Sequence, residues 1–430
     1  MSERLNILYL HSHDTGRLIQ PHGAPVPTPN LQALADEGVL FRQAFCAAPT
    51  CSPSRAALLT GQAPHSCGML GLAHRGFAMP NSSRHLAGFL RSHGYRPFLC
   101  GVQHEIAQGR ELDLGYEEYL PPRYGGLEGA LTFLSRADIP EPFFLSVGFF
   151  ETHRRFADPG PWENPDRCAP PPPLPDTPET RYDMACFKAS ARVLDHKVGI
   201  ALHDLRRRGL DRRTIVVCTT DHGPAFPRMK CNLTDGGLGV MLILRGPSGT
   251  GLAGGKVVDG LVSHIDVFPT LCELAGLPAP AWLQGASAMP LVRGEARRIH
   301  EQVYGEVTYH AAYEPMRCVR TERHKYIRRF GGRARPVLPN CDDGPSKDVW
   351  VRAGWKTTEL AEEELYDLAF DPNEARNLIA EPAAADLARD LRQRLRRWME
   401  QTDDPLLRGP VPAPAGAEVA DPDWTAVKGP

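Results

Sequence analysis

Residues 143–153 read Phe-Phe-Leu-Ser-Val-Gly-Phe-Phe-Glu-Thr-His, and this stretch decides the fold class. Its first seven residues form a continuous, largely apolar run, which is typical of a strand buried on both faces of a parallel sheet. The run ends in polar residues, among them His153. Sites in open α/β sheets form beyond the carboxyl ends of strands, so the stretch also indicates where the chemistry lies.

Strand-like and helix-like segments alternate along the chain on both sides of this run. Buried strands are predicted at residues 6–11, 96–100, 214–219 and 240–244, and helices at 29–37, 86–93 and 185–208. This alternation predicts an α/β fold with a large, mainly parallel central sheet flanked by helices. A proline-rich stretch at 156–178 is predicted to be a surface loop.

The pattern changes after residue 300. Short strands are expected at 303–306, 317–320 and 325–330, followed by a helix at 383–402. These segments predict a smaller C-terminal α+β unit of antiparallel strands. We expect three parts: a main domain over 1–300, a C-terminal subdomain over 301–405 and an extended tail over 406–430.

Composition restricts the kinds of partner and compartment. The chain has 430 residues, with 49 Lys and Arg against 51 Asp and Glu, which disfavours nucleic-acid and membrane-surface partners. No apolar stretch approaches the ~18 residues of a membrane-spanning helix, and the start lacks a signal-peptide pattern. The eleven cysteines show no disulfide framework and no zinc-binding pair. We therefore expect a cytoplasmic protein.

Polar side chains follow four of the predicted strands at the point where each strand ends. These residues are His13 and Asp14 after 6–11, His104 after 96–100, His153 after 143–149, and Asp221 and His222 after 214–219. The carboxyl ends of parallel strands meet at one edge of a sheet, so these groups are expected to come together.

Residues 49–61 read Pro-Thr-Cys-Ser-Pro-Ser-Arg-Ala-Ala-Leu-Leu-Thr-Gly. They predict a helix that Ser52 caps, with Pro53 at its first position and Gly61 at its end. A helix N-terminus offers free N–H groups and a positive dipole end, which suit an anion. Arg55, one turn further on, is placed to pair with the same anion.

The spacing Cys51-x-Pro53-x-Arg55 before Leu-Leu-Thr-Gly61 resembles the active-site signature of the type I sulfatases, in the alkaline phosphatase superfamily. The stretch Asp221-His222-Gly223 is similar to that family's metal motif, and residues 364–378 to its C-terminal signature. The resemblance implies an alkaline-phosphatase-like fold and hydrolysis of sulfate groups. It also implies that a formylglycine-generating enzyme oxidises Cys51 to formylglycine.

Within the family the resemblance is strongest to the heparan N-sulfatases, or sulfamidases. The shared stretches include His65-x-x-Gly68-Met69, Phe226-Pro227 and Glu314-Pro315-Met316-Arg317. They imply a small anionic substrate, a sulfated saccharide similar to N-sulfoglucosamine. The bond cleaved is a sulfate ester or a sulfamate, and the sequence leaves both open.

The resemblance assigns one divalent cation, Ca²⁺, Mg²⁺ or Mn²⁺, to Asp14, Asp221 and His222. His13 stands where most sulfatases have an aspartate. Either His13 is a ligand and the metal is softer than calcium, or it has turned away from the site. Carboxylates combined with imidazoles suit Ca²⁺ less well than Mg²⁺ or Mn²⁺.

The catalytic residues implied are Cys51, Arg55, His104, His153 and Lys230. Val102 departs from the family because a lysine that binds the sulfate group is expected there. A missing charged donor typically costs about 3 kcal/mol of transition-state stabilisation. Arg17 and Arg154 are candidates for a replacement.

Two other functions stay open at the level of sequence. The first is a phosphodiesterase or phosphonate monoester hydrolase on the same scaffold, since such relatives also pair Asp with His at the metal motif. The second is a degenerate, non-catalytic member of the fold that binds an anionic sugar, which His13 and Val102 favour.

Overall fold

The centre of the computed structural model, which describes residues 4–120 and 125–427, is an eight-stranded sheet in the order β5-β4-β6-β1-β7-β8-β2-β9. Its strands are β1 Asn6–Ser12, β2 Val39–Phe41, β4 Arg96–Gly101, β5 Glu118–Leu120, β6 Phe143–Gly148, β7 Thr214–Thr220, β8 Leu242–Arg245 and β9 Lys256–Val258. Neighbours pair in parallel except along β8, which is antiparallel to both β7 and β2. The predicted, mainly parallel sheet is confirmed.

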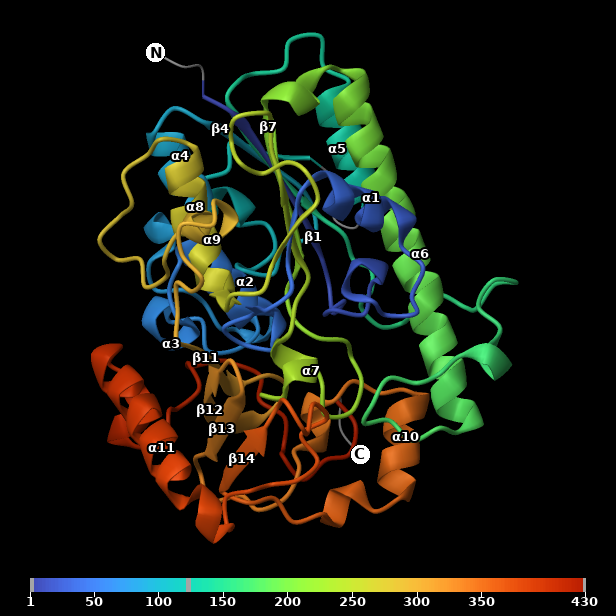
Figure 1. Cartoon of the computed structure of the whole chain (residues 1–430), viewed down its shortest axis with the longest axis vertical. Coiled ribbons are helices and arrows are strands. Elements are labelled where there is room, and N and C mark those ends of the chain that lie inside the picture. Colours follow the sequence, from blue (N-terminus) through green and yellow to red (C-terminus); the bar gives the residue numbers. More distant parts are fainter. Residues whose placement is uncertain (1–3, 121–124, 428–430) are drawn as a thin grey trace.

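Helices cover both faces of this sheet (Figure 1). One face packs α1 Pro29–Glu37, α5 Gly126–Leu134 and α6 Pro178–Arg207, and the other packs α2 Cys51–Thr60, α4 Leu86–Ser92 and α8 Val267–Leu274. Side chains of β1 alternate between the two layers: Ile7 and Tyr9 join one core and Leu8 and Leu10 the other. Burial on both faces explains why the middle of β1, residues 7–10, is apolar.

Most predicted bounds hold within a residue or two, but α6 begins seven residues earlier than the prediction of 185–208. Thr177 caps α6 through a reciprocal capping box with Thr180, and Pro178 occupies the first helical position. The proline-rich stretch is a loop interrupted by one 3₁₀ turn at Pro165–Arg167. Its final prolines therefore lead directly into the capped helix.

The predicted Ser52 cap is wrong. Helix α2 begins at Cys51 with Thr50 at the cap position, and no side chain caps it. The hydroxyl of Ser52 instead accepts a hydrogen bond of 3.0 Å from the backbone N–H of Ala73. Gly61 ends the helix as predicted, with φ of 67°, a conformation that glycine adopts without strain.

A second, four-stranded antiparallel sheet forms the C-terminal part, in the order β11-β12-β13-β14. Its strands are β11 Gln302–Tyr309, β12 Tyr313–Thr321, β13 His324–Arg329 and β14 Glu363–Asp367, and α11 Ala385–Gln401 packs on one face. All three predicted strands exist: β11 and β12 are longer than predicted, and β13 is displaced by one residue, whereas β14 was not foreseen. The opposite face of the sheet meets the main domain through Met316, Cys318 and Ile327.

Short elements complete the described chain: β3 Ala44–Phe45, β10 Val262–Ser263, α3 Pro64–Cys67, α7 Asp235–Leu238, α9 Met289–Val292 and α10 Pro345–Arg352. The C-terminal tail lies on the surface and is held by backbone hydrogen bonds from Glu418 to Arg75 and from Ala420 to Ala311. The last residues of the predicted tail, 428–430, fall outside the described part.

The eleven cysteines are free thiols. Among the described residues, no helix has the length and apolar character needed to cross a bilayer.

His85 at the start of α4 predicts a pH dependence of stability. Its Nδ1 accepts a 3.2 Å hydrogen bond from the backbone N–H of Ala87, and burial lowers the pKa of this histidine to about 3. Below pH 6.5 the unfolded chain binds a proton at this histidine that the folded chain excludes. The free energy of unfolding therefore decreases as the pH is lowered. This histidine alone is expected to cost about 2 kcal/mol at pH 5 relative to neutral pH.

The variant His85→Asn keeps a capping oxygen without a titrating ring. Between pH 7.5 and pH 5, the free energy of unfolding measured by chemical denaturation should decrease less in the variant than in the parent, by about 2 kcal/mol. Identical losses in both proteins would contradict the assignment.

Candidate active site

The carboxyl ends of β1, β4, β6 and β7 bring the predicted polar groups together. His13 and Asp14 follow β1, and Asp221 and His222 follow β7, its parallel neighbour. Asp14 has φ of 54°, a left-handed conformation that aspartate tolerates better than most residues. Its N–H donates a 2.8 Å hydrogen bond to Asp221 Oδ1, and this contact ties the two strand ends together.

Cys51 lies at the N-terminus of α2, directly against this group. Its Sγ is 3.4 Å from His222 Nε2, and the residue is 2 % exposed. Burial, together with the carboxylates of Asp14 and Asp221, raises the pKa of the Cys51 thiol well above its usual value, although Lys230 opposes this. An unmodified thiol here is protonated and therefore a poor nucleophile.

Two imidazole rings flank His13. The ring centroid of His13 lies 4.9 Å from that of His104 and 4.7 Å from that of His153. His13 Nε2 is 3.3 Å from His104 Nδ1, whereas His13 Nδ1 faces the carboxylates of Asp14 at 3.0 Å and Asp221 at 3.1 Å. His13 has therefore not turned away from the site.

Arg55 is buried and points at the strand ends. Its guanidinium donates to Asp221 Oδ2 at 3.0 Å and to the carbonyl of Ser12 at 2.9 Å. Burial opposes its charge, but Asp221 and Glu105 raise the pKa of Arg55 above its usual value. Arg55 thus neutralises a carboxylate at the base of the site.

Lys230 occupies the other side of the site. Its Nζ donates to Asp14 Oδ2 at 2.8 Å and to Asp342 Oδ2 at 2.7 Å. Arg228, two residues earlier in the chain, donates to the backbone carbonyl of Glu374 instead. The structure therefore brings Lys230, and not Arg228, to the cluster.

Neither candidate for the missing lysine at Val102 points at Cys51. Arg17 donates to the carbonyl of Ala44 and lies over the ring of Phe45. Arg154 makes two hydrogen bonds to Asp183. The chain turns at Gly101, which has φ of 73°. Glycine is required there because a Cβ would clash with the carbonyl of Gly148. The residues that follow deliver His104 to the site.

Sequence reasoning missed Asp342. This aspartate comes from the loop between β13 and β14, and its carboxylate, His153 and Asp14 each offer a ligand atom within 4.8 Å of one another. Burial opposes its ionisation, but Lys230 lowers the pKa of Asp342 to about 2. No local pattern could reveal it, because the contact joins residues 112 positions apart.

His310, in the turn between β11 and β12, is a second contribution of the C-terminal part. It is 5 % exposed, and burial, reinforced by Lys230, lowers the pKa of this imidazole to about 3. On the side of the main domain, the ring centroid of His74 lies 5.8 Å from that of His104.

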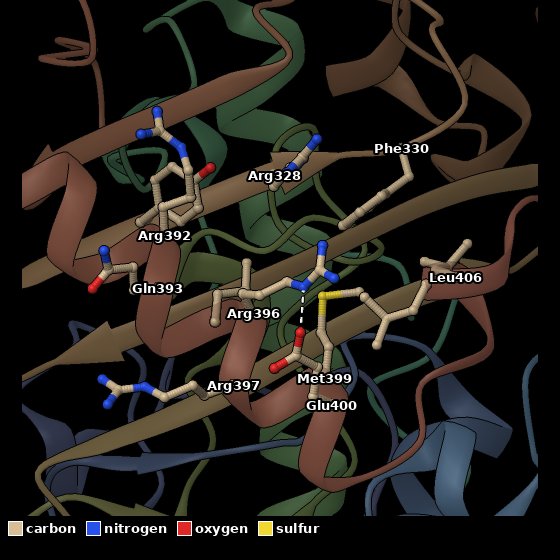
Figure 2. Close-up of a pocket in the computed structure, with 12 residues that line it drawn as sticks. Arg328, Phe330, Arg392, Gln393, Arg396, Arg397, Met399, Glu400 and Leu406 are labelled. Atoms are coloured by element: carbon tan, nitrogen blue, oxygen red, sulfur yellow. Dashed lines mark hydrogen bonds and ion pairs between the residues drawn. The ribbon is translucent and has the colours of Figure 1, made fainter.

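A cavity of about 710 Å³ lies elsewhere, between α11 and β13 (Figure 2). Apolar side chains such as Leu395, Met399 and Leu406 form its floor, and arginines including Arg328 and Arg396 stand around it. None of the predicted site residues lines this cavity. We therefore take the cluster around Cys51, and not this cavity, as the candidate active site.

Comparisons with known proteins cover nearly the whole chain. A family model described as "Sulfatase" matches residues 6–118 and 126–277, and one described as "N-sulphoglucosamine sulphohydrolase, C-terminal" matches residues 230–336. The chain is 28% identical to N-sulphoglucosamine sulphohydrolase of Homo sapiens, over 90% of this chain and 88% of the relative. It is 26% identical to a delta 4,5-hexuronate-2-O-sulfatase of Bacteroides thetaiotaomicron, over 94% of this chain and 90% of the relative.

A solved structure extends the likeness to the fold. It superposes with a TM-score of 0.73 at 17% identity, covers 95% of this chain and 99% of that chain, and holds its substrate D-glucosamine-2-N,6-O-disulfate. The predicted alkaline-phosphatase-like fold with its smaller C-terminal sheet agrees with this similarity.

Proposed function

Because the chain belongs to the sulfatase family, we propose that it removes sulfate from a saccharide through a formylglycine formed from Cys51. The enzyme class follows from the family: it is a hydrolase of sulfate esters or sulfamates. The observation that carries the proposal is the position of Cys51, buried at a helix N-terminus and 3.4 Å from His222. Oxidation of the thiol by a formylglycine-generating enzyme would convert a poor nucleophile into an aldehyde whose hydrate supplies the attacking hydroxyl.

The residues around Cys51 fit a divalent cation. His13, Asp14, Cys51 and Asp221 are buried and have ligand atoms within 4.8 Å of one another, and His222 Nε2 lies 3.3 Å from Asp14 Oδ1. Asp14, Asp221, His222 and His13 would hold it. Such a cation, when bound, polarises the sulfate oxygens and lowers the pKa of the attacking hydroxyl.

One lysine and two histidines of the chain take part in the remaining steps of the proposed reaction. Lys230, at the edge of the cluster, stabilises negative charge on the sulfate oxygens in the transition state. His153 protonates the leaving oxygen or nitrogen. His104 is neutral, since burial and then His13 hold its pKa well below the usual value, and it accepts the proton as sulfate is released. The net reaction consumes one water and yields the desulfated sugar and sulfate.

A sulfated saccharide is the substrate that the relatives support. The human relative is named for N-sulfoglucosamine, and the solved structure holds a glucosamine disulfate. In this chain His310 and Asp342 reach the site from the C-terminal part, where contacts to the sugar would determine which sulfate is cleaved. A cytoplasmic location stays a prediction.

The proposal is tested on protein co-expressed with a formylglycine-generating enzyme. Mass spectrometry of the tryptic peptide spanning residues 43–55 should show the mass change from thiol to aldehyde. The matured protein should then hydrolyse nitrophenyl sulfate with a kcat/KM at least about 100-fold above that for a nitrophenyl phosphodiester. N-sulfoglucosamine and 6-O-sulfoglucosamine, compared by sulfate release, separate sulfamate from ester cleavage. A preference for the phosphodiester would overturn the proposal.

A further inference from the structure

The four proposed metal ligands form a donor set with two nitrogens and two oxygens. His222 Nε2 lies 3.3 Å from Asp14 Oδ1 and 3.7 Å from Asp221 Oδ2, and His13 Nδ1 faces the same two oxygens. Building on the proposed function, we propose that this set binds a first-row transition-metal dication, Zn²⁺ or Mn²⁺, in preference to Ca²⁺.

Each carboxylate turns one oxygen toward the imidazole nitrogens, and its other oxygen is held by hydrogen bonds from the protein. Asp14 Oδ2 accepts a 2.8 Å hydrogen bond from Lys230. Asp221 Oδ1 accepts from the backbone N–H groups of Asp14 at 2.8 Å and His222 at 2.9 Å. The oxygens that face His13 are Asp14 Oδ1 and Asp221 Oδ2, and Asp221 Oδ2 also accepts a 3.0 Å hydrogen bond from Arg55. The two carboxylates therefore supply few oxygens, whereas Ca²⁺ takes about six to eight oxygen ligands.

The imidazole nitrogens are oriented as ligands. His222 Nδ1 is 2.9 Å from the carbonyl oxygen of Gly223, and since a carbonyl only accepts, Nδ1 carries the hydrogen. This leaves Nε2, the ring nitrogen that faces Asp14 Oδ1 at 3.3 Å, as the one placed to bind a cation. A backbone carbonyl behind the ring is the usual support of a metal-binding histidine. His13 is supported in the same way by His104, which contacts its Nε2 at 3.3 Å.

The spacing of the donor atoms suits a small cation. Ligands bonded at about 2.1 Å are separated by about 3.0 Å at right angles and about 3.4 Å in a tetrahedron. The separations between the imidazole nitrogens and carboxylate oxygens run from 3.0 to 3.7 Å. Mixed imidazole and carboxylate sets of this kind favour first-row transition metals over calcium.

The experiment measures metal binding apart from catalysis, in a Cys51→Ala background that cannot turn over substrate and offers no thiol. The protein is stripped with a chelator and dialysed against Zn²⁺, Mn²⁺ or Ca²⁺, and bound metal is measured by mass spectrometry. We expect one equivalent of Zn²⁺ or Mn²⁺, bound at least tenfold more tightly than Ca²⁺. Co²⁺ as a probe should give the visible absorption of an imidazole-ligated ion.

His13→Asp restores an oxygen donor, and it should reduce the preference over Ca²⁺ at least tenfold. His13→Gln also removes the nitrogen ligand but adds no charge, so it provides a second test if the aspartate variant does not fold. It should weaken the binding of Zn²⁺ or Mn²⁺. The matched control is His203→Asp, the same exchange at an exposed position of α6, and it should leave the preference unchanged. Tighter binding of Ca²⁺, or a preference that neither His13 variant alters, overturns the inference. Because turnover is not measured, either outcome leaves the proposed sulfatase reaction to its own assay.

Discussion

Replacing Cys51 with alanine is expected to abolish sulfate release, lowering kcat by at least about 10⁴-fold. Alanine has no thiol to mature, so the proposed aldehyde, whose hydrate would supply the attacking hydroxyl, cannot form. The substitution removes a single buried atom next to His222, and we expect it to cost about 1 kcal/mol of stability or less. Sulfate release by ion chromatography, together with thermal unfolding followed by circular dichroism, checks both halves of this prediction.

Two further variants sharpen the test. Cys51→Ser retains a hydroxyl but not the thiol that the maturing enzyme requires, and it should be as inactive as the alanine variant. Cys67→Ala is the matched control: this buried cysteine lies in α3 and its Sγ contacts the carbonyl of Pro64. It should keep the activity of the parent. Full turnover in either Cys51 variant would refute the formylglycine proposal.

The second large effect is expected on stability, at Arg317 in β12. Its guanidinium donates to Asp404 Oδ2 at 2.6 Å and to the carbonyl of Val307 at 2.8 Å, and both Arg317 and Asp404 are fully buried. Arg317→Met leaves the carboxylate of Asp404 buried without its counter-charge. Breaking a buried pair in this way typically costs about 3–5 kcal/mol, which chemical denaturation measures.

Arg323→Met is the matched control, because this arginine pairs with Asp367 at the surface and its side chain is 54% exposed. A change within about 0.5 kcal/mol is expected for it. Equal stability of the Arg317 and Arg323 variants would contradict the role assigned to Arg317. Metal binding by properly folded Arg317→Met should match the parent, since Arg317 contacts none of the proposed ligands.

Arg317 also shows how a sequence motif can suggest the wrong role. Its stretch, Glu314-Pro315-Met316-Arg317, resembles sulfamidases and points to substrate. In the structure Arg317 instead ties the C-terminal sheet to Asp404, and Glu306 beside it binds the backbone N–H of His65 in the main domain. The motif therefore reports how the two parts of the chain are joined as much as what they bind.

The sequence alone determined the sheet and the edge on which the site lies. Apolar runs specify strands buried on both faces, and parallel strands collect their carboxyl ends at one edge. His13, His104, His153 and Asp221 had to meet there once those strands paired. Local signals also set most helix ends, although Ser52 was misread as a cap because its hydroxyl finds the distant N–H of Ala73.

Only the tertiary structure decided which atoms face one another. The contact of Lys230 with Asp342, the pairing of Arg55 with Asp221 and the inward turn of His13 join residues far apart in the chain. Such contacts depend on how loops and the second sheet pack, and sequence periodicity carries no information about that packing. The metal preference that we propose depends on the same contacts, because they orient the oxygens and nitrogens that would bind the cation.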